Sequence, residues 1–246
     1  MIKIEHMETF GWDAALRGMR NPLNSWDKSD TKTCGELHCK ECPFDEAEGG
    51  CPDIFYIIGP NDLSLAKKLS KAGSTHSKFR RMIPVFMDIT APLYWWKEFD
   101  TYKVGTVANS CSTMHKIHTK PFEVDDFSHE HLINDIYEPH SYASNVVQNW
   151  NFGDVLWVTI QALNNARELY LETKDKKYWW QMIQLLPSSY NQKRTVMLNY
   201  EVLASMYRDR KNHKLDEWVQ FCEEIKKLPY AKDLITMEAD DEDKDI

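Results

Sequence analysis

The sequence predicts an α+β fold in which several helices carry a few strands. Residues 1–7 and 80–90 alternate apolar and polar side chains, which is the pattern of half-buried strands. Other segments repeat apolar residues at helical spacing between capping and stop signals. A polar stretch with four cysteines interrupts these elements. We therefore expect one domain over residues 1–236 with a Cys-rich insertion at residues 31–53.

The N-terminal half contains two predicted strands and three predicted helices. Proline and glycine mark several of the boundaries, because proline suits a first helical turn and glycine suits a helix end. The expected elements are a strand at 1–7, helices at 12–20 and 62–72, a strand at 80–90, and a helix at 93–103 that Ala91-Pro92 opens.

The C-terminal half is expected to be mainly helical. Residues 104–116 are small and polar, which indicates a loop followed by one helical turn, and residues 117–150 show no periodic pattern. Asp154 is expected to cap the first long helix. The helices are expected at 154–172, 177–186, 195–208 and 214–228.

The composition excludes several classes of protein. Of the 246 residues, 42% are hydrophobic and 12% are aromatic, which excludes a globally disordered chain. The net charge of −8 argues against non-specific coating of nucleic acid, although an acidic run at 237–246, expected to be a disordered tail, contributes part of it. No apolar run is long enough to cross a membrane, and Met1 to His6 lack the apolar region of a signal peptide. A cytoplasmic location with reduced thiols is therefore expected.

One face of the predicted 195–208 helix carries both an amide and a guanidinium. Asn199, Leu203, Met206 and Arg210 lie at offsets of four, seven and eleven, so they share a helical face. Charged side chains are rarely buried unless they are paired. Arg210 is therefore expected either to form an ion pair at a helix end or to meet an anionic ligand.

Two segments carry an ordered pattern of chemistry-bearing residues. In the first, His76 precedes a strand, Ala91-Pro92 opens a helix, Thr101-Tyr102-Lys103 ends it, and the element Asn109 to His115 follows.

The second segment contains Leu186-Pro187, then Asn199, Arg210, His213 and Glu217, in that order. Together the two segments, residues 76–115 and 186–217, resemble the flavin-dependent thymidylate synthases, the ThyX family. In that family Arg-His-Arg stands where this chain has Thr101-Tyr102-Lys103.

The resemblance implies a ThyX-like fold and a homotetramer with FAD and dUMP bound in clefts where subunits meet. It implies reductive methylation of dUMP or a related pyrimidine nucleotide, or hydroxymethylation. Methylenetetrahydrofolate would supply the carbon, reduced flavin the hydride, and NADPH the electrons that reduce the flavin. The cofactors would carry the chemistry, while the protein would position them.

The resemblance also implies roles for individual residues. Arg210 would be the catalytic residue, polarising the uracil, and would also bind substrate together with Ser110 and Ser112. The cofactor-binding residues would be His76, Lys103, Asn199 and His213.

The chain departs from the family pattern at the expected phosphate-binding positions. Two arginines and a histidine become Thr101, Tyr102 and Lys103, and lysine offers a point charge where arginine offers a bidentate fork. Glu98 replaces a glutamine, and Met114-His115 replaces Arg-Tyr. A second hypothesis therefore stands beside the enzyme: a non-catalytic protein of the same fold that uses a zinc-stabilised insertion to contact protein or nucleic acid.

The insertion carries four cysteines at chelating distances along the chain, namely Cys34, Cys39, Cys42 and Cys51. Four thiolates suit tetrahedral Zn²⁺, and a metal can fold a loop that has little core of its own. An iron–sulfur cluster also uses four cysteines, but its usual spacings differ from these. Zinc is therefore the expected metal, with an iron–sulfur cluster and free thiols as the alternatives.

Overall fold

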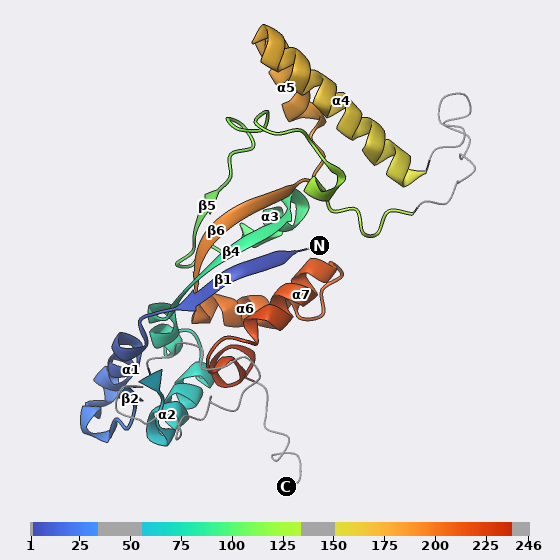
Figure 1. Ribbon diagram of the computed structural model, residues 1–246. Helices are drawn as coiled ribbons and strands as arrows, with labels where there is room; N and C mark the ends of the chain where they lie inside the picture. Colours follow the sequence, from blue (N-terminus) through green and yellow to red (C-terminus); the bar gives the residue numbers. More distant parts are fainter. Residues whose placement is uncertain (1, 34–55, 134–150, 238–246) are drawn as a thin grey trace. The chain divides into compact units, whose positions relative to one another are not determined.

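The computed structural model describes residues 2–33, 56–133 and 151–237 (Figure 1). The chain divides into two compact units. The first unit comprises Met1–Lys3, Ile89–Thr101 and Asn109–Arg194, and the second comprises Ile4–Asp88, Tyr102–Ala108 and Thr195–Ile246.

A four-stranded sheet has the strand order β1-β4-β6-β5 (Figure 1). Its strands are β1 (Lys3–Thr9), β4 (Pro84–Pro92), β5 (Val107–Ser110) and β6 (Asn191–Asn199). The predicted strands at 1–7 and 80–90 are confirmed in place, with β4 beginning at Pro84 because residues 77–82 form a 3₁₀ helix instead.

Two elements of the sheet were wrongly predicted. Val107–Ser110 is a strand rather than a loop, and the helix expected to begin at Thr195 begins at Tyr200. The preceding residues form β6, where alternate side chains such as Val196 and Leu198 are buried. Asn199 is consequently the N-cap of the helix and does not lie on its face, in keeping with the preference of asparagine for that position.

The second unit is built from helices around aromatic side chains. Its helices are α1 (Trp12–Arg20), η1 (Asn21–Leu23), η2 (Trp26–Lys28), α2 (Pro60–Lys71), η5 (Ser77–Met82), α6 (Tyr200–Arg210), α7 (Asp216–Ile225) and the π-helical turn η7 (Lys232–Thr236). The ring centroids of Trp12 and Tyr200 lie 5.1 Å apart, and Trp218 and Phe221 are fully buried. Gly11 begins α1 with φ +77°, and a Cβ there would lie 2.3 Å from the Met82 carbonyl oxygen, so only glycine fits.

The first unit contains a long helical hairpin. Its helices are α3 (Leu93–Phe99), η6 (Val124–Asp126), α4 (Phe152–Thr173) and α5 (Lys176–Leu185), and α4 packs against α5 (Figure 1). The hairpin's buried side chains include Ile160, Leu163 and Met182. The expected cap Asp154 is part of a capping box, but the N-cap itself is Asn151. Helix α3 ends at Phe99, short of the expected end at Lys103.

A two-stranded antiparallel ribbon joins β2 (Lys32–Thr33) to β3 (Tyr56–Ile57), with Lys32 opposite Ile57. The ribbon brings together the two ends of the segment that carries Cys34, Cys39, Cys42 and Cys51, and these four cysteines lie outside the described residues. Within 2–33, 56–133 and 151–237, no group of three His, Cys, Asp or Glu side chains could hold a metal ion. Most of the acidic run, residues 238–246, also lies outside these ranges. None of the described helices is long and apolar enough to cross a membrane.

Candidate functional site

Arg210 ends helix α6 of the second unit within a cluster of aromatic and polar side chains. Its Nε donates a hydrogen bond of 3.0 Å to the Tyr102 hydroxyl, and its Nη1 lies 2.9 Å from Nε2 of His213. The guanidinium carbon is 4.9 Å from the ring centroid of Trp218, which is a cation–π distance. Arg210 is half-buried, and its guanidinium contacts Tyr102, His213 and Trp218.

The hydrogen bonds around His213 cannot all be satisfied by one neutral ring. The backbone N–H of Leu215 points at Nδ1 from 3.2 Å, while the Arg210 Nη1, which can only donate, points at Nε2. A neutral imidazole offers one lone pair, so one of these two donors faces an N–H. Arg210 carries a positive charge and several N–H donors in this cluster. Such a group suits a carbonyl or an oxyanion as ligand.

Helix α7 contributes buried side chains to this cluster. Trp218 is fully buried and Glu217 is 7% exposed. Burial and the charge of Glu223 raise the pKa of the Cys222 thiol to about 11, against the opposing charges of Lys226 and Arg210. Cys222 therefore stays protonated at neutral pH, and its thiol acts as a small apolar side chain rather than a nucleophile.

Asn199 fixes the loop from which Tyr102 reaches Arg210. Its Oδ1 accepts a hydrogen bond of 3.0 Å from the Val202 N–H, and its Nδ2 donates to the carbonyls of Val104 and Gly105 at 3.1 and 3.4 Å. Gly105 has φ +69°, and a Cβ there would lie 2.8 Å from the Asn199 Nδ2. The buried amide is thus engaged by the protein itself, and the structure gives Asn199 a role in holding this loop.

The other predicted cofactor residues of the second unit are exposed. His76 precedes η5, and Lys103 lies on the same loop as Tyr102. Tyr102 was treated from the sequence only as a departure from the family pattern, and its contact with Arg210 was missed. The sequence feature that could have indicated this contact is that Tyr102, whose hydroxyl can form hydrogen bonds, stands where the family has a histidine.

The predicted substrate residues Ser110 and Ser112 belong to the first unit. Ser110 ends β5 and is exposed. Ser112 lines a cavity of about 530 Å³, and its Oγ accepts a hydrogen bond of 2.8 Å from the His115 N–H. A volume of this size lies in the usual range for small-molecule sites.

The cavity of the first unit has a lining of mixed charge that includes three lysines and the two aspartates Asp125 and Asp126. Lys116, Lys120 and Lys193 contribute positive charge, and Lys120 forms an ion pair with Asp126. Burial, together with the charges of Asp126 and Cys111, raises the pKa of the Tyr190 hydroxyl, so this phenol remains a neutral hydrogen-bonding group. Lysine side chains beside a serine hydroxyl suit a phosphate group.

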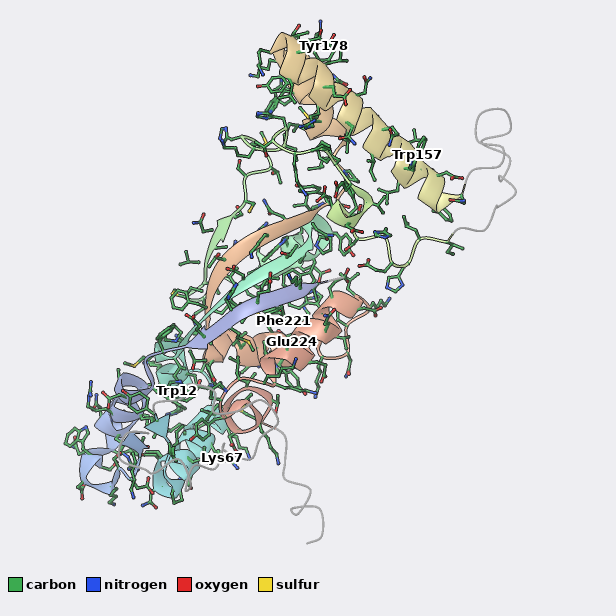
Figure 2. All side chains as sticks on the ribbon, viewed as in Figure 1. Trp12, Lys67, Trp157, Tyr178, Phe221 and Glu224 are labelled. Atoms are coloured by element: carbon green, nitrogen blue, oxygen red, sulfur yellow. The ribbon has the colours of Figure 1, made fainter. Side chains whose placement is uncertain are left out.

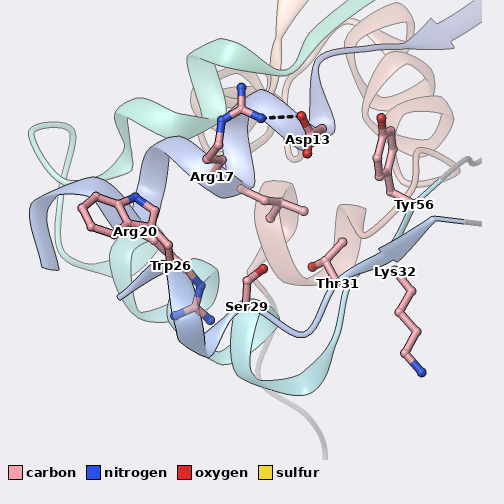
Figure 3. A pocket seen from close by; sticks show the side chains of 9 residues that line it. Asp13, Arg17, Arg20, Trp26, Ser29, Thr31, Lys32 and Tyr56 are labelled. Atoms are coloured by element: carbon pink, nitrogen blue, oxygen red, sulfur yellow. Dashed lines mark hydrogen bonds and ion pairs between the residues drawn. The ribbon is translucent and has the colours of Figure 1, made fainter. Parts of the chain in front are cut away.

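A second cavity, of about 390 Å³, lies in the second unit between α1 and the β2–β3 ribbon (Figure 3). Arg17 and Asp13 form an exposed ion pair at its rim. Arg20 is 3% exposed, and its Nε lies 2.5 Å from the Oδ1 of the fully buried Asp62. Burial alone would raise the pKa of Asp62, but hydrogen bonds from Thr31, Ser29 and Arg20 and the charge of Arg20 outweigh it and lower that pKa. This pair anchors residues 29–31 to α2.

Comparison with known proteins defines the class of fold. No protein-family model matches the sequence, and no curated protein matches it. In structure, the chain has the fold of the flavin-dependent thymidylate synthases, so the resemblance predicted from the sequence is confirmed at the level of fold.

Three solved structures illustrate the likeness. Thymidylate synthase X (ThyX) from Helicobacter pylori, with FAD and dUMP, gives a TM-score of 0.61 at 15% identity over 96% of this chain and 98% of that one. A second structure of the H. pylori enzyme with FAD and dUMP gives 0.60 at 16% identity over the same shares. The UMP/dUMP methylase PolB from Streptomyces cacaoi, bound with 5-Br dUMP, gives 0.54 at 15% identity over 95% of this chain and 91% of that one.

Proposed function

We propose that this chain is a divergent flavin-dependent thymidylate synthase-like enzyme that adds a one-carbon unit to C5 of dUMP or a related pyrimidine nucleotide. The observation that carries the proposal is the Arg210–Tyr102–His213 cluster, in a chain that has this fold over 96% of its length. The predicted positions of Arg210 and His213 came from the family pattern, and the structure brings these two side chains into contact.

Arg210 is proposed to polarise a uracil carbonyl. As C5 becomes nucleophilic, negative charge develops on the carbonyl oxygen, and a guanidinium already oriented by Tyr102 and Trp218 stabilises it without reorganising. In the first unit, Ser112 with Lys116 and Lys193 is proposed to bind a phosphate.

The proposed cofactors are FAD, methylenetetrahydrofolate and NADPH. Bound FAD would supply the hydride, and the folate would supply the carbon. The predicted cofactor-binding residues differ in how well they could contact FAD. Lys103 and His76 are exposed, whereas the amide of Asn199 already forms hydrogen bonds with Val202 and Val104. Flavin binding is therefore proposed to rest on His76, Lys103 and His213, with Asn199 acting through the loop.

Exposed apolar side chains on the α4–α5 hairpin support the proposed homotetramer. Trp157 on α4 is 58% exposed (Figure 2), and Phe152 and Val155 nearby are also exposed. Such a group of apolar side chains in the first unit is typical of an association surface. The reaction and the proposed assembly fit a cytoplasmic protein.

The metal of the Cys-rich segment remains a proposal. Zn²⁺ at Cys34, Cys39, Cys42 and Cys51 is the favoured form, and metal analysis with an absorbance spectrum separates it from an iron–sulfur cluster. The residues on either side of the segment are paired, with Lys32 opposite Ile57 and Thr33 opposite Tyr56. The alternative is a non-catalytic protein that contacts its partner through this segment. The absorbance spectrum of the same purified protein also tests this alternative, because it shows whether flavin is bound.

The test is formation of dTMP from dUMP, methylenetetrahydrofolate, NADPH and FAD. We expect wild-type protein to gain flavin absorbance and to form product, Arg210→Ala to lose product formation by at least a hundredfold, and both to show the same circular dichroism. Arg208→Ala is the matched control, because Arg208 lies on the same helix, is exposed and pairs with Asp209. A colourless protein that neither binds FAD nor forms product would contradict the proposal and favour the binding protein.

A further inference from the structure

The backbone of Cys111 is held from both sides by strand β6 of the same unit. Its N–H donates a hydrogen bond of 2.9 Å to the Lys193 carbonyl, and its carbonyl accepts one of 2.7 Å from Nε2 of Gln192. Cys111 and the next residue, Ser112, both line the cavity of about 530 Å³. Strand β6 therefore contacts this cavity wall both through its backbone and through the Gln192 side chain.

The orientation of the Gln192 amide is set by its neighbours. Its Oε1 accepts a hydrogen bond of 2.9 Å from Nε of Arg194, and arginine can only donate. The amide nitrogen must therefore face the Cys111 carbonyl, which can only accept. Gln192 is 7% exposed, so water offers little competition for either bond. The amide is locked in the one orientation that holds Cys111.

Arg194 is fixed in turn by helix α3 and the residue after it. Its Nη1 donates a hydrogen bond of 2.8 Å to Asp100, and its guanidinium carbon lies 4.2 Å from the centroid of the Trp96 ring. The buried Trp96 donates from Nε1 to the Gln192 carbonyl at 3.0 Å. A continuous set of contacts thus runs from Asp100 through Arg194 and Gln192 to the cavity wall.

We propose that Gln192 and Arg194 are positioning residues that hold the Cys111–Ser112 wall in place to bind a pyrimidine nucleoside monophosphate; this inference rests on the proposed function. The Ser112 hydroxyl oxygen already accepts from the His115 N–H, so its own O–H points elsewhere and is free to donate to a phosphate oxygen. Gln192 and Arg194 act through this wall. Moving the wall lowers affinity for the nucleotide, while Arg210, on the second unit, keeps its own contacts.

The decisive variant is Gln192→Glu. A glutamate keeps the shape of the side chain and still accepts from Arg194, but it has no N–H for the Cys111 carbonyl and places two acceptors face to face. We expect the Kd and the KM for dUMP to rise about tenfold with kcat and the thermal midpoint retained. Amide hydrogen exchange in a peptide covering residues 109–115 should become faster.

Two further variants separate positioning from general effects. Gln181→Glu is the matched control, because Gln181 also donates from its amide to a backbone carbonyl, that of Lys177, but on the exposed surface of α5. It should leave dUMP affinity and exchange at 109–115 unchanged. Cys111→Ala should lower the affinity for dUMP less than Gln192→Glu does, because Gln192 bonds to the backbone of Cys111 and not to its side chain.

The result against the inference is a Gln192→Glu protein whose dUMP affinity and 109–115 exchange both match those of Gln181→Glu. The inference would also be overturned if Cys111→Ala lost as much affinity for dUMP as Gln192→Glu, or more. If wild-type protein binds no dUMP, the proposed function fails separately. The positioning role of Gln192 is then tested by amide hydrogen exchange at residues 109–115 alone. Faster exchange in Gln192→Glu supports that role, and unchanged exchange refutes it.

Discussion

Replacing Asp62 with asparagine tests the energetics of the most completely buried ion pair described in the second unit. The Asp62 carboxylate accepts hydrogen bonds from the Ser29 hydroxyl at 2.7 Å, from the backbone N–H groups of Asp30 and Thr31 at 3.2 and 3.1 Å, from the Thr31 hydroxyl at 2.6 Å, and from Arg20 at 2.5 Å. Asparagine removes the charge and turns one acceptor into a donor that faces donors.

The expected cost is large because the arginine remains. Arg20 is 3% exposed, and its Nη2 already has no hydrogen-bond partner. Removing one member of a buried pair costs about 3–5 kcal/mol, since it leaves an uncompensated buried charge. For a domain of this size, that corresponds to a fall in thermal midpoint of about 6–20 °C.

Urea unfolding followed by circular dichroism measures the effect, with Asp13→Asn as the control. Asp13 pairs with Arg17 on the surface, where the side chains are 60% and 64% exposed, and such pairs contribute about 0–1 kcal/mol. Arg20→Met should cost less than Asp62→Asn, because Asp62 would keep its four other donors. A loss below about 1 kcal/mol for Asp62→Asn, or one equal to that of Asp13→Asn, would refute this reasoning.

The pH dependence has a definite sign. The pKa of Asp62 is lower in the folded protein than its ordinary value, so the folded state favours the carboxylate. This contribution to stability is fully present above the unfolded-state pKa of about 3.9 and is lost as the pH falls through the lower folded-state value. The difference in unfolding free energy between wild type and Asp62→Asn should therefore shrink in acid below that range.

Three more outcomes are expected. Asn199→Ala removes the α6 N-cap and two bonds to the loop carbonyls, so urea unfolding should show a loss of about 1–2 kcal/mol; an unchanged midpoint would argue against the loop-holding role. Native Cys222, with its pKa of about 11 and 1% exposure, should resist alkylation by iodoacetamide at pH 7.5 until the protein unfolds, as peptide mass spectrometry will reveal. Trp157→Glu should reduce the oligomeric state in light scattering while retaining the circular dichroism spectrum, and an unaltered mass would exclude Trp157 from the interface.

Much of the fold was readable from local sequence patterns. Helix α1 was predicted with both its ends, because an amphipathic run is followed by Asn21-Pro22. Helices α4 and α5 were also predicted, with shifts of one or two residues at their ends, whereas their packing against each other was not. The boundary between β6 and α6 was misplaced, because Thr195 to Asn199 contain apolar residues that fit either period, and their burial in a sheet is a non-local property.

The candidate site was predicted less completely. The order of Asn199, Arg210 and His213 indicated the resemblance, and the structure shows a contact between Arg210 and His213 that the sequence did not predict. Tyr102 was missed, since its contact with Arg210 spans 108 positions in the sequence. The engagement of the Asn199 amide by Val104 and Gly105 was equally invisible, because it depends on how a distant loop returns to the helix cap.

The sequence by itself determined the α+β class, the helix signals, the family resemblance at Arg210 and the chelating spacing of Cys34 to Cys51, because each depends on residue types close together along the chain. Only the tertiary structure decided that Tyr102 orients Arg210, that Arg20 is buried against Asp62, and that Gln192 holds Cys111. These contacts join residues 42 to 108 positions apart. Hydrogen bonds require donor and acceptor to meet within about 3 Å, and chain order alone does not specify such distances.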